Sequence, residues 1–197
     1  MKRSSLVTLF FSCILAMFVV FVSFCFEAQA VELDGIEVPS TLQVGGKTLH
    51  LNGYGVRTYS FLGIHIYAAS LYLEHLSNDP NEIIQSPETK MLSVKFEHAV
   101  SADQSRDSWR TALQNNCIAP CRLDPQDVES FISRVPAMAA GDYFYLIFSQ
   151  NGATVSANGQ QIGVISRRQF ANAVLATFLG PHPASPTLKQ ELLGSHS

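Results

Sequence analysis

The chain has 197 residues, of which 47% are hydrophobic and 15% are charged, and its formal net charge at pH 7 is −3. This composition excludes a disordered, collagen-like or low-complexity polypeptide, because such chains lack the apolar side chains that bury a core. The acidic balance also argues against nucleic-acid binding, which requires a clustered basic surface.

Residues 1–30 have the features of a secretory signal peptide. Two basic residues precede an uncharged, largely apolar run over residues 6–26, and Ala28-Gln29-Ala30 places small side chains where a signal peptidase cleaves. We therefore expect cleavage after Ala30, a single mature domain over residues 31–197, and a periplasmic or otherwise exported location. The alternative is an uncleaved leader. At about 1.5 Å per residue the run is long enough to span a bilayer and would anchor the protein to a membrane.

Cleavage would leave two cysteines, Cys117 and Cys121. In an exported protein we expect them to form a disulfide, which closes a very short loop and so stabilises that loop more than the whole fold. Three residues separate the pair, which is not the two-residue spacing of a thioredoxin-like redox site. The histidines are scattered without ligand spacing, so we predict no metal site. Phosphate-binding and dinucleotide motifs are also absent, and we expect no cofactor.

The first half of the mature chain is rich in β-branched and aromatic residues interrupted by glycines, which predicts a meander of antiparallel strands. These strands are expected over residues 48–51, 56–61 and 64–73. Gly53-Tyr54-Gly55 predicts a turn or bulge. Residues 64–73 have no polar alternate set, so we expect this strand to be central and covered on both faces. A helical turn should follow over residues 79–85, and another strand over 91–96.

Two helices are predicted next from their capping residues. Ser101 and Gln104 form a capping box before an apolar stripe that includes Trp109. Asp124 caps a second helix that begins with a proline, and Pro136 should end it.

The last third of the chain returns to strands and ends in helices. Strands are expected over residues 143–148, 154–157 and 161–165, the last two joined by an Asn158-Gly159 hairpin turn. A helix should then open with a capping box at Ser166 and end at Gly180, followed by a helical turn over 188–193. Strands, helices, strands and a helix in this order predict an α+β fold, a largely antiparallel sheet covered by a layer of helices.

One segment carries a recognisable family pattern. Gly53-Tyr54-Gly55-Val56-Arg57 is followed by a short turn and by a strand that ends in Tyr72-Leu73-Glu74. This pattern resembles the chalcone isomerase-like superfamily, and residues 158–194 resemble its exported bacterial branch. The resemblance covers nearly all of the mature chain. It implies an open-faced β-sandwich in which a large antiparallel sheet and a layer of helices enclose a cleft.

The resemblance also implies a binding site. The superfamily includes plant enzymes that cyclise chalcones to flavanones and fatty-acid-binding proteins that hold a carboxylate with an arginine, which carries over to Arg57. A guanidinium can bind a carboxylate through two parallel hydrogen bonds. The enzymes' threonine aligns with Tyr67, whose phenol can still donate, and strand alternation would place Tyr67 on one face with His65 and Ala69. The alternatives are that Arg57 pairs with an internal acid or lies at a sheet edge, and that Tyr67 is a core residue.

The chalcone-cyclising enzymes also place a tyrosine and an asparagine in the region that corresponds to residues 101–113, where this chain has neither. We therefore expect a non-catalytic protein that binds a small amphipathic carboxylate, such as a fatty acid, in an apolar cleft. One rival interpretation is an isomerase, an intramolecular lyase of the chalcone isomerase type. The other is an envelope interaction module without a small ligand.

Overall fold

The computed structural model describes residues 30–33, 36–59, 63–117 and 121–194. The predicted leader, apart from Ala30, lies outside these ranges, as does the end of the strand predicted over residues 56–61. Among the described residues, no helix is long and apolar enough to cross a bilayer.

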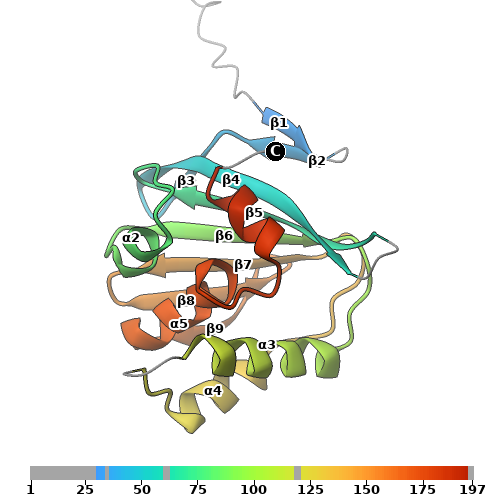
Figure 1. The fold of residues 1–197 in the computed structure, drawn as a ribbon, viewed down its shortest axis with the longest axis vertical. Helices are drawn as coiled ribbons and strands as arrows, with labels where there is room; N and C mark the ends of the chain where they lie inside the picture. Colours follow the sequence, from blue (N-terminus) through green and yellow to red (C-terminus); the bar gives the residue numbers. More distant parts are fainter. Residues whose placement is uncertain (1–29, 34–35, 60–62, 118–120, 195–197) are drawn as a thin grey trace, which may run out of the picture.

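The core of the fold is one antiparallel sheet in which each strand lies beside its neighbours in the sequence, in the order β3-β4-β5-β6-β7-β8-β9 (Figure 1). Its strands are β3 (Thr41–Val44), β4 (Lys47–Tyr59), β5 (Ile64–Leu73), β6 (Lys90–Phe96), β7 (Tyr143–Ser149), β8 (Gly152–Ala157) and β9 (Gln160–Ile165). A separate hairpin of β1 (Ala30–Leu33) and β2 (Ile36–Pro39) precedes it. The predicted antiparallel meander is confirmed.

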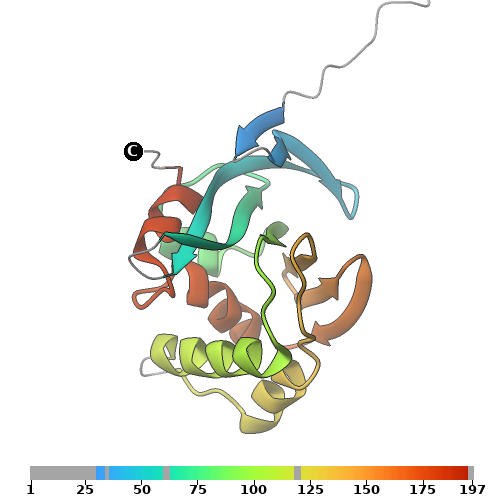
Figure 2. The ribbon, with the colours of Figure 1, turned by 90° about the vertical axis from the view of Figure 1, so that its right-hand side faces the viewer.

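Five helices of the described chain cover one face of this sheet, which we call the inner face. They are α2 (Pro80–Gln85), α3 (Ala102–Asn116), α4 (Pro125–Ile132), α5 (Arg168–Leu179) and α6 (Pro186–Leu192). The turned view shows a curved sheet with α3, α5 and α6 on one side of it (Figure 2). Apolar side chains from the inner face and from all five helices form a single core cluster. This is the predicted layer of helices on an antiparallel sheet.

Strand β5 is buried on both faces, as its sequence predicted. Ala69 and Leu71 point inward to the main core, whereas Tyr72 packs on the outer face with Val38 and Leu49. The outer cluster forms because residues around β2 and the start of β4 cover that side. The strand is therefore sandwiched, which explains its lack of a polar alternate set.

Three short sequence motifs have the local structure that they predicted. Ser101 and Gln104 form the predicted capping box, and Asp124 caps α4. Asn158 and Gly159 both have positive φ, +49° and +77°, as the predicted hairpin turn requires.

Two predictions about helix ends were wrong. No side chain caps α5, which begins at Arg168; the preceding Arg167 instead forms ion pairs with Asp124 (3.1 Å) and Asp127 (3.3 Å). Helix α4 ends at Ile132, before the predicted stop. A proline ring clashes with the carbonyl four residues earlier, so Pro136 prevents the helical turn that would lead up to it.

Gly53 and Gly55 allow α6 to lie directly on β4. A Cβ atom at Gly53 would overlap the backbone carbonyl oxygens of Glu191 and Leu192, and one at Gly55 would overlap the Glu191 side chain. The pairing of β4 with β5 skips Asn52, which confirms a bulge here, and the Asn52 side-chain amide donates to the carbonyl of Leu192 (2.9 Å). The glycine pair thus serves a helix-docking role.

Lys90 is a buried cation at the inner face of β6. Its ammonium donates to the carbonyls of Ser86 (2.7 Å) and Glu88 (3.1 Å), and the residue is 4% exposed. Burial lowers the pKa of Lys90 to about 8; Arg168 acts in the same direction, while Glu88 and Glu74 oppose it. The unfolded chain therefore binds more protons than the folded chain between pH 8 and the ordinary lysine pKa of 10.5.

This shift predicts that Lys90 makes the protein more stable as the pH rises through that window. Between about pH 7.5 and about pH 9.5, the wild type should gain on the order of 1 kcal/mol in free energy of unfolding relative to Lys90→Met. Urea unfolding of both proteins at the two pH values measures the difference. Parallel pH profiles for the two proteins would contradict the prediction.

Candidate ligand cavity

A cavity of about 480 Å³ lies between the inner face of the sheet and α3. Its volume is within the range of small-molecule sites. Apolar and aromatic side chains make most of its wall: Val94, Phe96, Trp109, Met138, Phe144 and Phe178. Residues 182–184, between α5 and α6, line it from the C-terminal side. The cavity is the cleft that the predicted fold implied.

The structure brings the two predicted binding residues together in this cavity. Arg57 on β4 and Tyr67 on β5 are direct cross-strand partners, and both line the cavity wall. The guanidinium carbon of Arg57 lies 5.6 Å from the centre of the Tyr67 ring. Arg57 is half-buried, and no carboxylate of the described residues lies within 4.0 Å of its guanidinium nitrogens. Among the described residues, Arg57 therefore does not form the ion pair with an internal acid that was the alternative interpretation.

A bulge in β5 shapes the cavity at this point. Arg57 pairs with Tyr67, but the next residue, Thr58, pairs with His65, so Ile66 is an extra residue in the ladder. Ile66 and Tyr67 consequently both line the cavity. The expectation that His65 shares a face with Tyr67 was wrong, because the bulge reverses the alternation between them.

Burial keeps the Tyr67 phenol neutral. Burial raises the pKa of Tyr67, and the positive charge and hydrogen bond of Arg57 offset part of this increase. Tyr67 is therefore a hydrogen-bond donor at physiological pH. A permanently charged guanidinium beside a neutral phenol can bind an anion through several donors, and the low dielectric of an apolar cavity strengthens such bonds.

Helix α3 contributes residues that the sequence argument did not assign to the site. Ser105, Trp109 and Ala112 line the cavity at spacings of four and three, which is one helical face. The capping box at Ser101 fixes where this helix begins, so the face could have been traced from it. Trp109 also packs edge-on against Phe131 at 5.1 Å between ring centres, which fixes the wall of the cavity in the core.

A buried amide holds the C-terminal side of the cavity. Asn116, the last residue of α3, donates to the carbonyls of His182 (2.8 Å) and Ala112 (2.9 Å) and accepts from the His182 amide (3.1 Å). The predicted disulfide between Cys117 and Cys121 is present and begins at the residue directly after Asn116. The segment that carries His182 is thereby tied to the end of α3.

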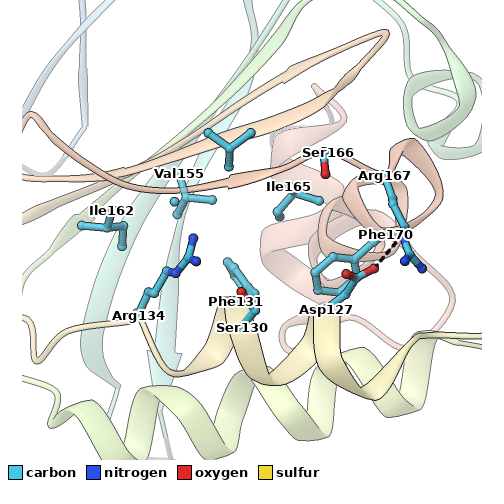
Figure 3. Close-up of a pocket in the computed structure, with 12 residues that line it drawn as sticks. Asp127, Ser130, Phe131, Arg134, Val155, Ile162, Ile165, Ser166, Arg167 and Phe170 are labelled. Carbon is cyan, nitrogen blue, oxygen red and sulfur yellow. Dashed lines mark ion pairs between the residues drawn. The ribbon is translucent and has the colours of Figure 1, made fainter.

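A second, smaller pocket of about 160 Å³ lies elsewhere, between α4 and strands β8 and β9 (Figure 3). Arg134 and Phe131 reach from α4 and its C-terminal end toward the strands, and an ion pair between Asp127 and Arg167 lies at one side. None of the predicted site residues lies there. No group of three or more metal-ligating side chains occurs among the described residues.

The fold and the cavity define an α+β protein of the open-faced sandwich type, with an arginine and a phenol inside an apolar cavity between sheet and helices. The chain matches the family model of chalcone isomerase-like proteins over residues 30–194, and it belongs to that family. The predicted family and fold class are confirmed.

A crystal structure of a fatty-acid-binding protein from Arabidopsis thaliana has a similar fold. Its TM-score is 0.69 at 15% sequence identity, and the match covers 84% of this chain and 96% of that chain. At this identity the likeness establishes the shared fold. Among curated proteins, no sequence matches this chain.

Proposed function

We propose that this protein binds a small amphipathic carboxylate, such as a fatty acid, and does not transform it. Arg57 carries the proposal: a guanidinium without a carboxylate partner among the described residues faces an apolar cavity. The ligand carboxylate would supply the missing counter-charge, with Tyr67 as a second donor. The shared fold with a fatty-acid-binding protein supports this class of ligand.

The apolar wall supplies the other half of the interaction. Each methylene group that the cavity removes from water contributes about 0.8 kcal/mol. A medium-length acyl chain such as that of decanoate is therefore a suitable first probe for a cavity of about 480 Å³. The carboxylate would fix the orientation of the ligand, and the chain would supply most of the affinity.

The test compares decanoate with 1-decanol, which has the same chain length and no charge. Hydrogen bonds to a charged group contribute about 1.5–3 kcal/mol, so decanoate should bind roughly 10 to 150 times more tightly. Isothermal titration calorimetry on lipid-free protein measures both affinities. Equal affinities would refute carboxylate recognition. Turnover of a chalcone would favour the isomerase. A copurified protein partner without bound lipid would favour the interaction module.

We further propose that the protein is exported through its leader. The pattern of residues 1–30 supports cleavage after Ala30. Expression of the full chain in a Gram-negative host should yield a periplasmic protein whose first residue is Val31. Intact-mass measurement of the protein in the periplasmic and membrane fractions tests this. A full-length chain in the membrane fraction would indicate the uncleaved anchor instead.

A further inference from the structure

Ser105 presents an unpaired hydroxyl to the cavity. The residue is 8% exposed and lies on the face of α3 that lines the cavity. Among the described residues its hydroxyl has no hydrogen-bond partner, whereas the other buried hydroxyl of the wall, on Thr177, donates to the carbonyl of Val174 (2.7 Å). Buried hydroxyls are usually paired. An unpaired one in the wall of a cavity is a position where a ligand can supply the partner.

The hydroxyl is open to the cavity rather than sealed in the protein. Among the described residues, two side-chain polar atoms are fully enclosed and lack a hydrogen-bond partner. They are a carboxylate oxygen of Glu97 and a carboxylate oxygen of Glu191. Ser105 Oγ is not among them. Val100, Val135 and Met138 line the same cavity with apolar side chains.

The topology places Arg57 and Ser105 on two different walls of one cavity, the sheet and α3. Arg57 lies opposite Tyr67, and Tyr67 lies opposite Phe96 on the next strand. Two strand spacings separate Arg57 from Phe96, about 10 Å. Six residues after Phe96 the chain enters α3 at Ala102, and Ser105 in the first turn of this helix lines the same cavity. Ser105 is thus a buried polar group on the helix side of the cavity, and Arg57 is on the sheet side.

We propose that the ligand of this cavity is an oxygenated acyl chain, a hydroxy or oxo fatty acid, whose second oxygen bonds to Ser105. This rests on the proposed function, in which the carboxylate is held at Arg57. A serine hydroxyl both donates and accepts, so it suits either oxygen. A plain alkyl chain would leave the hydroxyl unpaired and shielded from water, which disfavours that chain relative to an oxygenated one.

The experiment compares decanoate with its 3-hydroxy, 5-hydroxy and 10-hydroxy derivatives by calorimetry. The wild type should bind at least one hydroxylated acid about tenfold more tightly than decanoate. The hydroxylated acid adds one neutral hydrogen bond and no longer leaves the Ser105 hydroxyl buried without a partner. In Ser105→Ala this preference should disappear, while decanoate binds as tightly as before or more tightly. Ser130→Ala is the matched control, because Ser130 is an exposed helical serine that lines the smaller pocket and not this cavity.

The outcomes separate the two proposals. If decanoate binds in an Arg57-dependent way but no hydroxylated acid binds better, or if Ser105→Ala keeps the preference, the oxygenated ligand is refuted and fatty-acid binding stands. If none of the four acids binds, both proposals fall. Equal thermal unfolding midpoints of wild type and Ser105→Ala confirm that the variant is folded.

Discussion

Replacing Arg57 with alanine should weaken decanoate binding roughly 10- to 150-fold and lower the free energy of unfolding by no more than about 2 kcal/mol. The loss of affinity follows because the guanidinium provides a paired set of charge-assisted hydrogen bonds to the carboxylate. The loss of stability should be limited because Arg57 forms no ion pair within the described chain. Its contact with the Tyr67 ring contributes about 0.5–1 kcal/mol and its hydrogen bond to the Tyr67 phenol about 1 kcal/mol. Calorimetric titration and thermal unfolding measure the two effects.

Three controls make this result specific. Arg57→Lys keeps the charge but loses the planar fork, so its affinity should lie between those of wild type and Arg57→Ala. Arg134→Ala removes an arginine that lines the smaller pocket and should leave decanoate binding as it is. Binding of 1-decanol should be equal in wild type and Arg57→Ala. If Arg57→Ala binds decanoate as tightly as the wild type, the carboxylate does not sit at Arg57.

The substitution Gly53→Ala should destabilise the protein by about 1–3 kcal/mol, because the added methyl group would overlap the backbone of α6. Backbone carbonyls cannot move aside as a side chain end can, so the whole helix must shift. The expected signature is a lower urea midpoint with an unchanged slope of free energy against urea concentration. Faster hydrogen exchange in α6 than in α5 would locate the effect.

Gly163→Ala is the matched control for this prediction. A Cβ atom there would lie 3.3 Å from the far end of the flexible Arg134 side chain and would meet no backbone. Alanine in place of glycine also reduces the entropy of the unfolded chain, which favours folding by about 0.4–1 kcal/mol where the backbone permits it. Gly163→Ala should therefore be neutral or slightly stabilising. An equal loss of stability in both variants would mean that α6 docking is not the cause.

Much of the fold could be predicted because its signals are local. The Asn158-Gly159 turn and the caps at Ser101 and Asp124 each depend on a few neighbouring residues, and the structure confirms all three. The cap predicted at Ser166 did not form; Arg167 stands at the cap position and pairs with Asp124 and Asp127, about 40 residues away in the sequence. A local pattern cannot contain such a contact.

The site could be predicted only in part. Arg57 and Tyr67 were found through a family resemblance, and the structure places them in one cavity. The bulge at Ile66, which turns His65 away from Tyr67, leaves no distinct mark in the sequence. Ser105 was missed because the apolar stripe of α3 was traced through Trp109, Ala112 and Leu113 only, and a serine on the same face adds no hydrophobic signal.

The amide of Asn116 bears on how a ligand of the proposed kind would enter and leave the cavity. It joins the end of α3 to His182, 66 residues further along the chain, through a hydrogen bond in each direction. Without this junction, the stretch between α5 and α6 would still be held by the Ala184 amide on the Thr177 carbonyl (3.4 Å) and by the Lys189 ammonium on the Gly180 carbonyl (2.9 Å), none of which lies in the sheet. If the cavity binds a ligand as proposed, weakening the Asn116 junction should speed its uptake and release more than it changes the affinity set at Arg57.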